Sequence, residues 1–163
     1  MRYIVLVGLM AAAICAHSAD GSMRGLNPII VFVEELPAAA KGCGVTRDGI
    51  RAAAEGPLSQ SRLQVVKFAT DVKAYLYIQV NVIAVQDTCM TNIYASFRTP
   101  AVVQENQNLT IGGIWNENVI GAAWPSEAPR KIHSAVENLT KKLIDEWSRD
   151  NPGKWGQSRI SAK

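Results

Sequence analysis

Residues 75–98, YLYIQVNVIAVQDTCMTNIYASFR, determine the fold class of this chain. On either side of a short polar break at Asp87-Thr88, apolar and polar residues alternate with a period of two. That alternation is typical of a strand with one buried side and one solvent-facing side. Two such strands joined by a short connection predict an antiparallel hairpin, which is the clearest structural signal in the sequence.

The alternation also predicts which residues face each other across the hairpin. Placing apolar residues opposite one another gives three pairs, Val82 with Ile93, Val80 with Ala95, and Ile78 with Phe97. A slip of one residue would mix the two faces, so the pattern selects this parity. The turn lacks the Asn-Gly or Asp-Gly pair that a tight hairpin turn prefers, and its type is left open.

The polar face of this predicted hairpin is the candidate binding surface. Its residues are Tyr75, Tyr77, Gln79, Asn81, Asn92, Tyr94, Ser96 and Arg98. Tyrosines, amides and an arginine on a rigid sheet are the residue types that binding surfaces favour. A solvated sheet face would show the same polar alternation, and tyrosine is also a good strand former. The residue types therefore fit two interpretations, a binding surface and an ordinary solvated sheet face.

The first 19 residues have the layout of a secretory signal peptide. Arg2 supplies a positive charge, residues 4–14 are apolar, and Ala16-His17-Ser18 offers small residues before a cleavage site at Ser18 or the residue after it. The apolar run is shorter than the roughly 20 residues that a bilayer-spanning helix needs. We therefore predict an exported protein, periplasmic or secreted, without stable membrane insertion once the leader is removed.

Export changes how the three cysteines are counted. Cys15 leaves with the leader, and Ile14 before it disfavours lipid attachment, which requires a small residue there. Cys43 and Cys89 remain in an oxidising compartment, where a disulfide is expected. Cys89 shares the parity of the apolar hairpin face, and Cys43 precedes the predicted helix that must cover that face. A metal site is not expected, because His133 is the one histidine left after cleavage.

Further elements flank the hairpin on both sides. Residues 29–33 are a short β-branched run that predicts a buried strand, covered on both faces or central in its sheet. Residues 63–68 predict a second short strand. A helix begins after an N-cap at Thr46, and Gly56-Pro57 either ends it or kinks it. Residues 109–123 are strand-like but interrupted by glycines, which leaves one bent strand or a loose hairpin open.

The last element is the most regular helix of the chain, between Pro125-Ser126 and Asn151-Pro152-Gly153. Its apolar residues recur at helical spacing: Ile132, Ala135, Val136, Leu139, Leu143 and Trp147. Residues 151–163 are predicted to be a mobile tail. The element order over residues 20–150 predicts a single α+β domain. It is a two-layer sandwich, with a mainly antiparallel sheet of four to five strands and two helices on one face.

Charge and motifs argue against several function classes. The net charge is +3 at pH 7, and one less without Arg2, which is too small to predict nucleic-acid binding. The carboxylates are scattered, and His133 has no local catalytic partner, so a small hydrolase is the least favoured reading and no cofactor is expected. We predict a non-enzymatic module that binds an unknown protein or small molecule. The alternative is an envelope component that assembles by strand addition.

Overall fold

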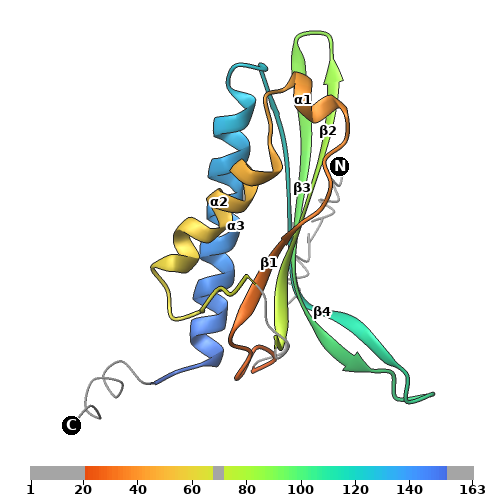
Figure 1. Ribbon diagram of the computed structural model, residues 1–163, viewed down its shortest axis with the longest axis vertical. Coiled ribbons are helices and arrows are strands. Elements are labelled where there is room, and N and C mark those ends of the chain that lie inside the picture. Colours follow the sequence, from red (N-terminus) through yellow and green to blue (C-terminus); the bar gives the residue numbers. More distant parts are fainter. Residues whose placement is uncertain (1–20, 68–71, 154–163) are drawn as a thin grey trace, which may run out of the picture.

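A four-stranded sheet in the order β1-β2-β3-β4 forms one layer of the protein, and helices form the other (Figure 1). The computed structural model describes residues 21–67 and 72–153. The strands are β1 (Ile29–Val33), β2 (Ala74–Val85), β3 (Thr88–Val102) and β4 (Leu109–Ala123); the helices are α1 (Ala39–Gly42), α2 (Arg47–Ser59) and α3 (Ala128–Asp150). Strand β1 pairs in parallel with β2, and the other two pairings are antiparallel. The predicted α+β class, with a mainly antiparallel sheet, is confirmed.

The central hairpin, β2 and β3, has the predicted faces but a different register. Val80 pairs with Ile93, where the pattern predicted Val82 as the partner. A shift of two residues keeps every side chain on its own face, so hydrophobic alternation cannot detect it. The turn decides the register instead, because Gln86 and Asp87 alone connect the strands, with Gln86 at a φ of 51°.

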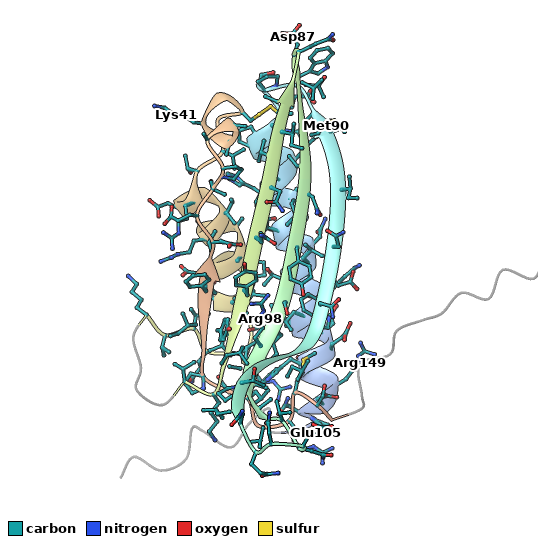
Figure 2. The ribbon with its side chains drawn as sticks, turned by 90° about the vertical axis from the view of Figure 1, so that its right-hand side faces the viewer. Lys41, Asp87, Met90, Arg98, Glu105 and Arg149 are labelled. Atoms are coloured by element: carbon teal, nitrogen blue, oxygen red, sulfur yellow. A yellow bond between two sulfur atoms is a disulfide. The ribbon has the colours of Figure 1, made fainter. Side chains whose placement is uncertain are left out.

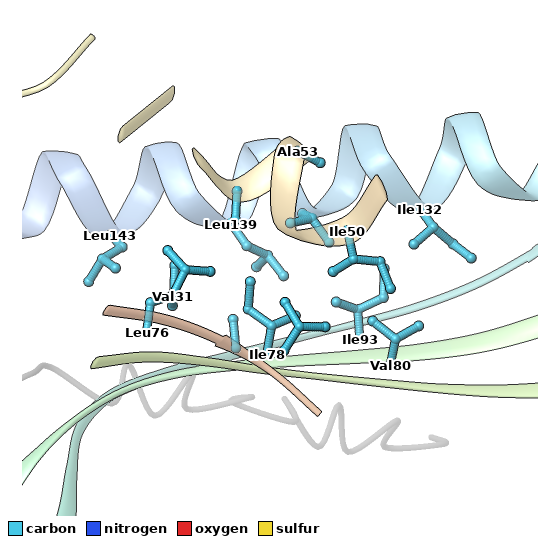
Figure 3. Close-up of a cluster of buried hydrophobic side chains, with 14 of the residues drawn as sticks. Val31, Ile50, Ala53, Leu76, Ile78, Val80, Ile93, Ile132, Leu139 and Leu143 are labelled. Atoms are coloured by element: carbon cyan, nitrogen blue, oxygen red, sulfur yellow. The ribbon is translucent and has the colours of Figure 1, made fainter. Parts of the chain in front are cut away.

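The inward face of the hairpin packs against α2 and α3 to form the core (Figure 3). Ten of its side chains are buried: Ala74, Leu76, Ile78, Val80, Val82, Cys89, Thr91, Ile93, Ala95 and Phe97. In Figure 3, Ile50 of α2 and Ile132 of α3 lie above Ile93 and Val80. The predicted stripe of α3 is buried except for Ala135, which is half-buried. Burying one such aliphatic side chain stabilises the fold by about 1.5–3 kcal/mol.

Helix α2 begins after the predicted N-cap and does not end at Gly56-Pro57. The hydroxyl oxygen of Thr46 accepts a hydrogen bond from the backbone N–H of Gly49 at 3.1 Å, which confirms the N-cap. The helix then continues through Pro57 to Ser59, so the reading in which Gly56-Pro57 ends it is wrong.

The pairing of the strands tests three predictions, for residues 29–33, 63–68 and 109–123. Both alternatives predicted for β1 were wrong: it lies at an edge of the sheet and is not central, and Phe32 is 45% exposed, so the strand is not covered on both faces. Residues 63–67 form no strand, only an isolated bridge between Ile29 and Val65; Phe68 lies outside the described residues. Residues 109–123 are one strand, bent at a bulge opposite Phe97 and Arg98.

The predicted disulfide between Cys43 and Cys89 is present. The two Cα atoms are 6.1 Å apart, and both side chains are buried. The bond links the C-terminal end of α1 to the start of β3. The predicted signal peptide and most of the predicted tail, residues 154–163, lie outside the described residues and stay predictions.

Candidate functional site

The sheet face opposite α2 and α3 carries the predicted binding surface (Figure 2). Its side chains form rows that run across the strands. One row places Ile30 of β1 beside Tyr75 of β2 and Arg98 of β3. The next row places Phe32 beside Tyr77. The parallel pairing of β1 with β2 thus adds two apolar side chains to the predicted surface.

A groove of about 450 Å³ opens on this face near β1. Its lining residues are Ile30, Phe32, Val72, Ala74, Tyr75, Tyr77, Arg98, Pro100 and Ile111. Arg98 is the one charged side chain among them. Tyr75, Tyr77 and Arg98 were predicted from the hairpin alone. Phe32 and Ile111 were missed, because nothing in the sequence shows that β1 and β4 contribute to the same face.

Tyr77 lines the groove and contacts four other side chains. The ring of Phe32 stacks on it, with centroids 5.8 Å apart and an interplanar angle of 10°. The guanidinium carbon of Arg98 lies 3.7 Å from the Tyr77 ring centroid, a cation–π contact. Tyr94 meets the ring edge-on at 6.5 Å. The phenolic O–H donates a hydrogen bond to Oε2 of Glu34.

The hydrogen bond to Glu34 also changes the acidity of Tyr77. The carboxylate accepts a hydrogen bond from the protonated phenol, and this bond raises the pKa of Tyr77 above the ordinary value of 10.0. Burial and the negative charge of Glu34 raise the pKa further. The positive charge of Arg98 acts the other way and lowers the pKa. Tyr77 is therefore a protonated, fixed aromatic surface at neutral pH.

Ser96 does not lie on the open surface as predicted. Its side chain is 1% exposed, and its hydroxyl has no hydrogen-bond partner among the described residues. The bulge in β4 brings the backbone close: a Cβ added at Gly113 would lie 3.1 Å from the Ser96 hydroxyl oxygen. This close approach of a neighbouring strand has no signal in the hairpin sequence.

The remaining predicted residues form a polar band beside the groove and do not line it. Asn81 pairs with Asn92, and Gln79 pairs with Tyr94. Asn81 is exposed, and the other three are half-buried. The structure therefore brings three of the eight predicted residues into the groove, four into the polar band, and buries one.

A second apolar area lies on the same face at the other end of the hairpin. We call it the tip patch, and it consists of Ile83, Val85, Met90 and Ile120, which are 63%, 48%, 48% and 74% exposed. Ile83 and Met90 are direct cross-strand partners. The polar band separates the tip patch from the groove, so the two areas can be tested independently.

The groove combines an almost wholly apolar lining with one guanidinium. Aromatic rings, aliphatic side chains and one guanidinium can hold an apolar body and orient a charged group. Over residues 21–67 and 72–153, His, Cys, Asp and Glu form no group of three that could hold a metal ion. Within the same ranges, no helix combines the length and apolar character needed to cross a membrane.

No protein-family model and no curated protein matches the chain. Solved structures with a similar arrangement include a point variant of the PelC dodecamer of Paraburkholderia phytofirmans, with a TM-score of 0.42, 12% identity, and coverage of 74% of this chain and 88% of that one. A minor lipoprotein of Acinetobacter baumannii has a TM-score of 0.40 at 10% identity, covering 77% and 95%. Lipoprotein GNA1162 of Neisseria meningitidis has a TM-score of 0.38 at 15% identity, covering 73% and 99%. Likeness this low carries no inference about what this chain binds or how it assembles.

Proposed function

We propose that this protein is an exported binding module whose groove on the outward sheet face holds an apolar ligand. The groove itself is the observation that carries the proposal: eight of its nine lining residues are apolar or aromatic, and Arg98 is the ninth. The disulfide between Cys43 and Cys89 and the signal-peptide layout of residues 1–19 support export.

The contacts around Tyr77 favour binding because they fix the groove wall before a ligand arrives. Phe32, Arg98 and Glu34 each restrain the ring from a different side. A side chain that is already ordered loses little conformational entropy on binding, which otherwise costs about 0.5–1.5 kcal/mol per side chain. A ligand can therefore cover the aromatic wall of the groove without first having to order it.

The test uses N-phenylnaphthylamine, an uncharged apolar dye that fluoresces when it leaves water. We expect saturable binding to the folded protein, and weaker binding to the Phe32→Ala variant, which removes one wall of the groove. Met90→Ala in the tip patch is the matched control and should bind as the wild type does. Equal binding by the Phe32→Ala variant, or a loss confined to Met90→Ala, would contradict the groove as the site.

A second candidate function is assembly by strand addition. The two edges of the sheet differ in whether their backbone is free to pair with another strand. The edge of β1 is occupied: the backbone of Ile29 bonds to Gln64 and Val66, and the carbonyl of Val33 accepts from Arg47 Nε at 2.8 Å. Strand β4 is the other edge and pairs with no further strand among the described residues. It contains no lysine, arginine or proline, the residues that usually protect an edge.

Light scattering over a concentration series tests this second candidate. We expect self-association that rises with concentration and is removed by Ile120→Lys, which places a charge on the β4 edge strand. Met90→Lys is the control, since Met90 is exposed but lies on β3, which is paired on both sides. A strict monomer at every concentration would remove this candidate.

A further inference from the structure

We infer that the ligand of the groove carries one anionic head on its apolar body, and that Arg98 binds this head. The inference rests on the proposed function and names the charge of the ligand. The occupant to which the observations point is a free single-chain amphiphile with a carboxylate head.

Arg98 has no ion-pair partner within residues 21–67 and 72–153. The ion pairs found among the described residues are Arg47–Glu35, Lys131–Glu127, Lys142–Glu117 and Arg149–Glu146, and none involves Arg98. Its contact within the described part of the chain is the Tyr77 ring, which one face of the guanidinium covers. The planar N–H groups of an arginine remain charged at all physiological pH values and match the two oxygens of a carboxylate.

The position of Glu34 sets the direction of the ligand. Its carboxylate accepts from the Tyr77 hydroxyl, and its backbone follows the pairs Phe32–Tyr77 and Val33–Ile78 in the direction of the hairpin tip. A negative head there would be repelled, whereas at Arg98 it is attracted. From Arg98 the apolar lining continues the other way, to Pro100 and Ile111 at the end of the β3–β4 pair and to Ile30 on β1. We therefore place the head at Arg98 and the chain along these residues.

The groove fits a single molecule better than a membrane surface. Attraction to an anionic bilayer comes from several lysines and arginines, each contributing about 1 kcal/mol near the surface. The groove wall supplies one cation, and its apolar residues line a concave space. A volume of about 450 Å³ lies in the lower part of the range for small-molecule sites. One head and one chain match these dimensions.

Displacement of N-phenylnaphthylamine tests the inference with three amphiphiles of equal chain length, each kept below its micelle concentration. Dodecanoate is negatively charged, dodecanol is neutral, and dodecylamine is positively charged. We expect dodecanoate to bind about 5- to 20-fold more tightly than dodecanol, the range of a charge-assisted hydrogen bond in a partly exposed site, and dodecylamine to bind most weakly. Equal affinities for all three would overturn the inference.

Variants of Arg98 locate the charge preference. Arg98→Gln should reduce dodecanoate binding to the level of dodecanol in the same variant; both ligands are measured on it, because the substitution also removes the Arg98 contact with the Tyr77 ring. Arg98→Lys keeps the charge without the planar fork and should retain part of the preference, which provides a readout if Arg98→Gln folds poorly. Arg130→Gln, an exposed arginine on α3, is the matched control. An unchanged preference for dodecanoate in Arg98→Gln would contradict the role of Arg98.

The outcomes separate this inference from the function on which it depends. If the dye and dodecanol do not bind, the proposed function fails. If both bind but dodecanoate has no advantage, only the charge inference fails. Methyl NMR should show dodecanoate-induced shifts at Ile30 and Ile111, with Ile83 and Ile120 of the tip patch unaffected; the reverse pattern overturns the location. Co-sedimentation with phosphatidylglycerol vesicles that needs Arg98 and resists competition by dodecanoate would overturn the choice of a free amphiphile.

Discussion

The hydroxyl of Tyr77, a residue of the groove wall, has a shifted pKa that can be measured. Its hydroxyl donates to Glu34, and its raised pKa has this hydrogen bond as the leading cause. We expect Glu34→Gln to lower the pKa of Tyr77 toward 10.0, because the negative acceptor is lost. An ultraviolet titration of the phenolate signal measures it. Glu35→Gln, which removes the partner of Arg47 instead, is the control and should leave the titration of Tyr77 unchanged.

The same contact makes stability depend on pH in the alkaline range. A tyrosine whose pKa is higher in the folded state than in the unfolded chain favours folding while it is protonated. Its contribution is complete below pH 10.0 and is lost as the pH rises through the raised pKa of Tyr77. Denaturant unfolding of the wild type should therefore show a free energy of unfolding that falls above pH 10.0. The fall should be smaller in the Glu34→Gln variant.

Gly49 is a residue whose missing side chain allows two helices to meet. A Cβ at this position would lie 2.7 Å from Nε2 of His133, whose side chain comes from α3. We expect Gly49→Ala to lower the free energy of unfolding by about 1–3 kcal/mol through overpacking. Gly42→Ala is the control, because a Cβ there meets nothing within 4 Å and should leave stability nearly unchanged. Equal effects in chemical denaturation would contradict this packing account.

Among the helices and strands, the disulfide joins two elements that are far apart in the sequence. It connects the end of α1 to the start of β3 across a sequence separation of 46 residues. The chain-entropy account attributes about 4 kcal/mol of stabilisation to closing a loop of this length. We expect the double variant Cys43→Ala/Cys89→Ala to lose roughly that amount in denaturant unfolding.

Reduction of the wild type provides a check on the disulfide prediction without changing the sequence. Adding a reductant should lower the midpoint of wild-type unfolding and leave the double alanine variant unaffected. A wild-type midpoint that does not move, together with two free thiols by mass spectrometry of the mature protein, would show that the cysteines are unpaired in solution.

At the scale of the whole molecule, the segment before β1 is attached to the C-terminal end of α3. The carboxylate of Asp150 accepts from the backbone N–H groups of Gly21 at 3.0 Å and Met23 at 2.9 Å. Nearby, the indole N–H of Trp147 donates to the carbonyl of Leu26 at 3.0 Å. These bonds connect residues more than 120 positions apart and hold the first and last described segments together.

We expect Asp150→Ala to lower the free energy of unfolding by about 2 kcal/mol, since it leaves two partly buried backbone donors without their charged acceptor. Amide hydrogen exchange at Gly21 and Met23 should accelerate in the same variant. Asp145→Ala is the control, being an exposed aspartate on the same helix. Unchanged exchange at Gly21 and Met23 would refute this role for Asp150.

Local patterns predicted those parts of the fold that depend on neighbouring residues. The alternation in β2 and β3 assigned their two faces correctly, and the spacing of apolar residues identified α3 with its buried stripe. Thr46 as the N-cap follows from the residue types at one helix end. The pairing of Cys43 with Cys89 followed from counting cysteines in an exported chain.

Residue identity and short-range periodicity were enough to predict the central hairpin with its two faces, the two longer helices and the disulfide. They did not predict α1, placed a strand at residues 63–68 where the described part forms only a bridge, and left residues 109–123 open. The register of the hairpin became visible in the folded structure alone, since a shift of two residues preserves every face. The tertiary structure decided the groove: Phe32 reaches Tyr77 through the parallel pairing of β1 with β2, 45 residues further along the chain, and the bulge in β4 buries Ser96. Such contacts between distant segments depend on how the layers pack, and no local pattern records them.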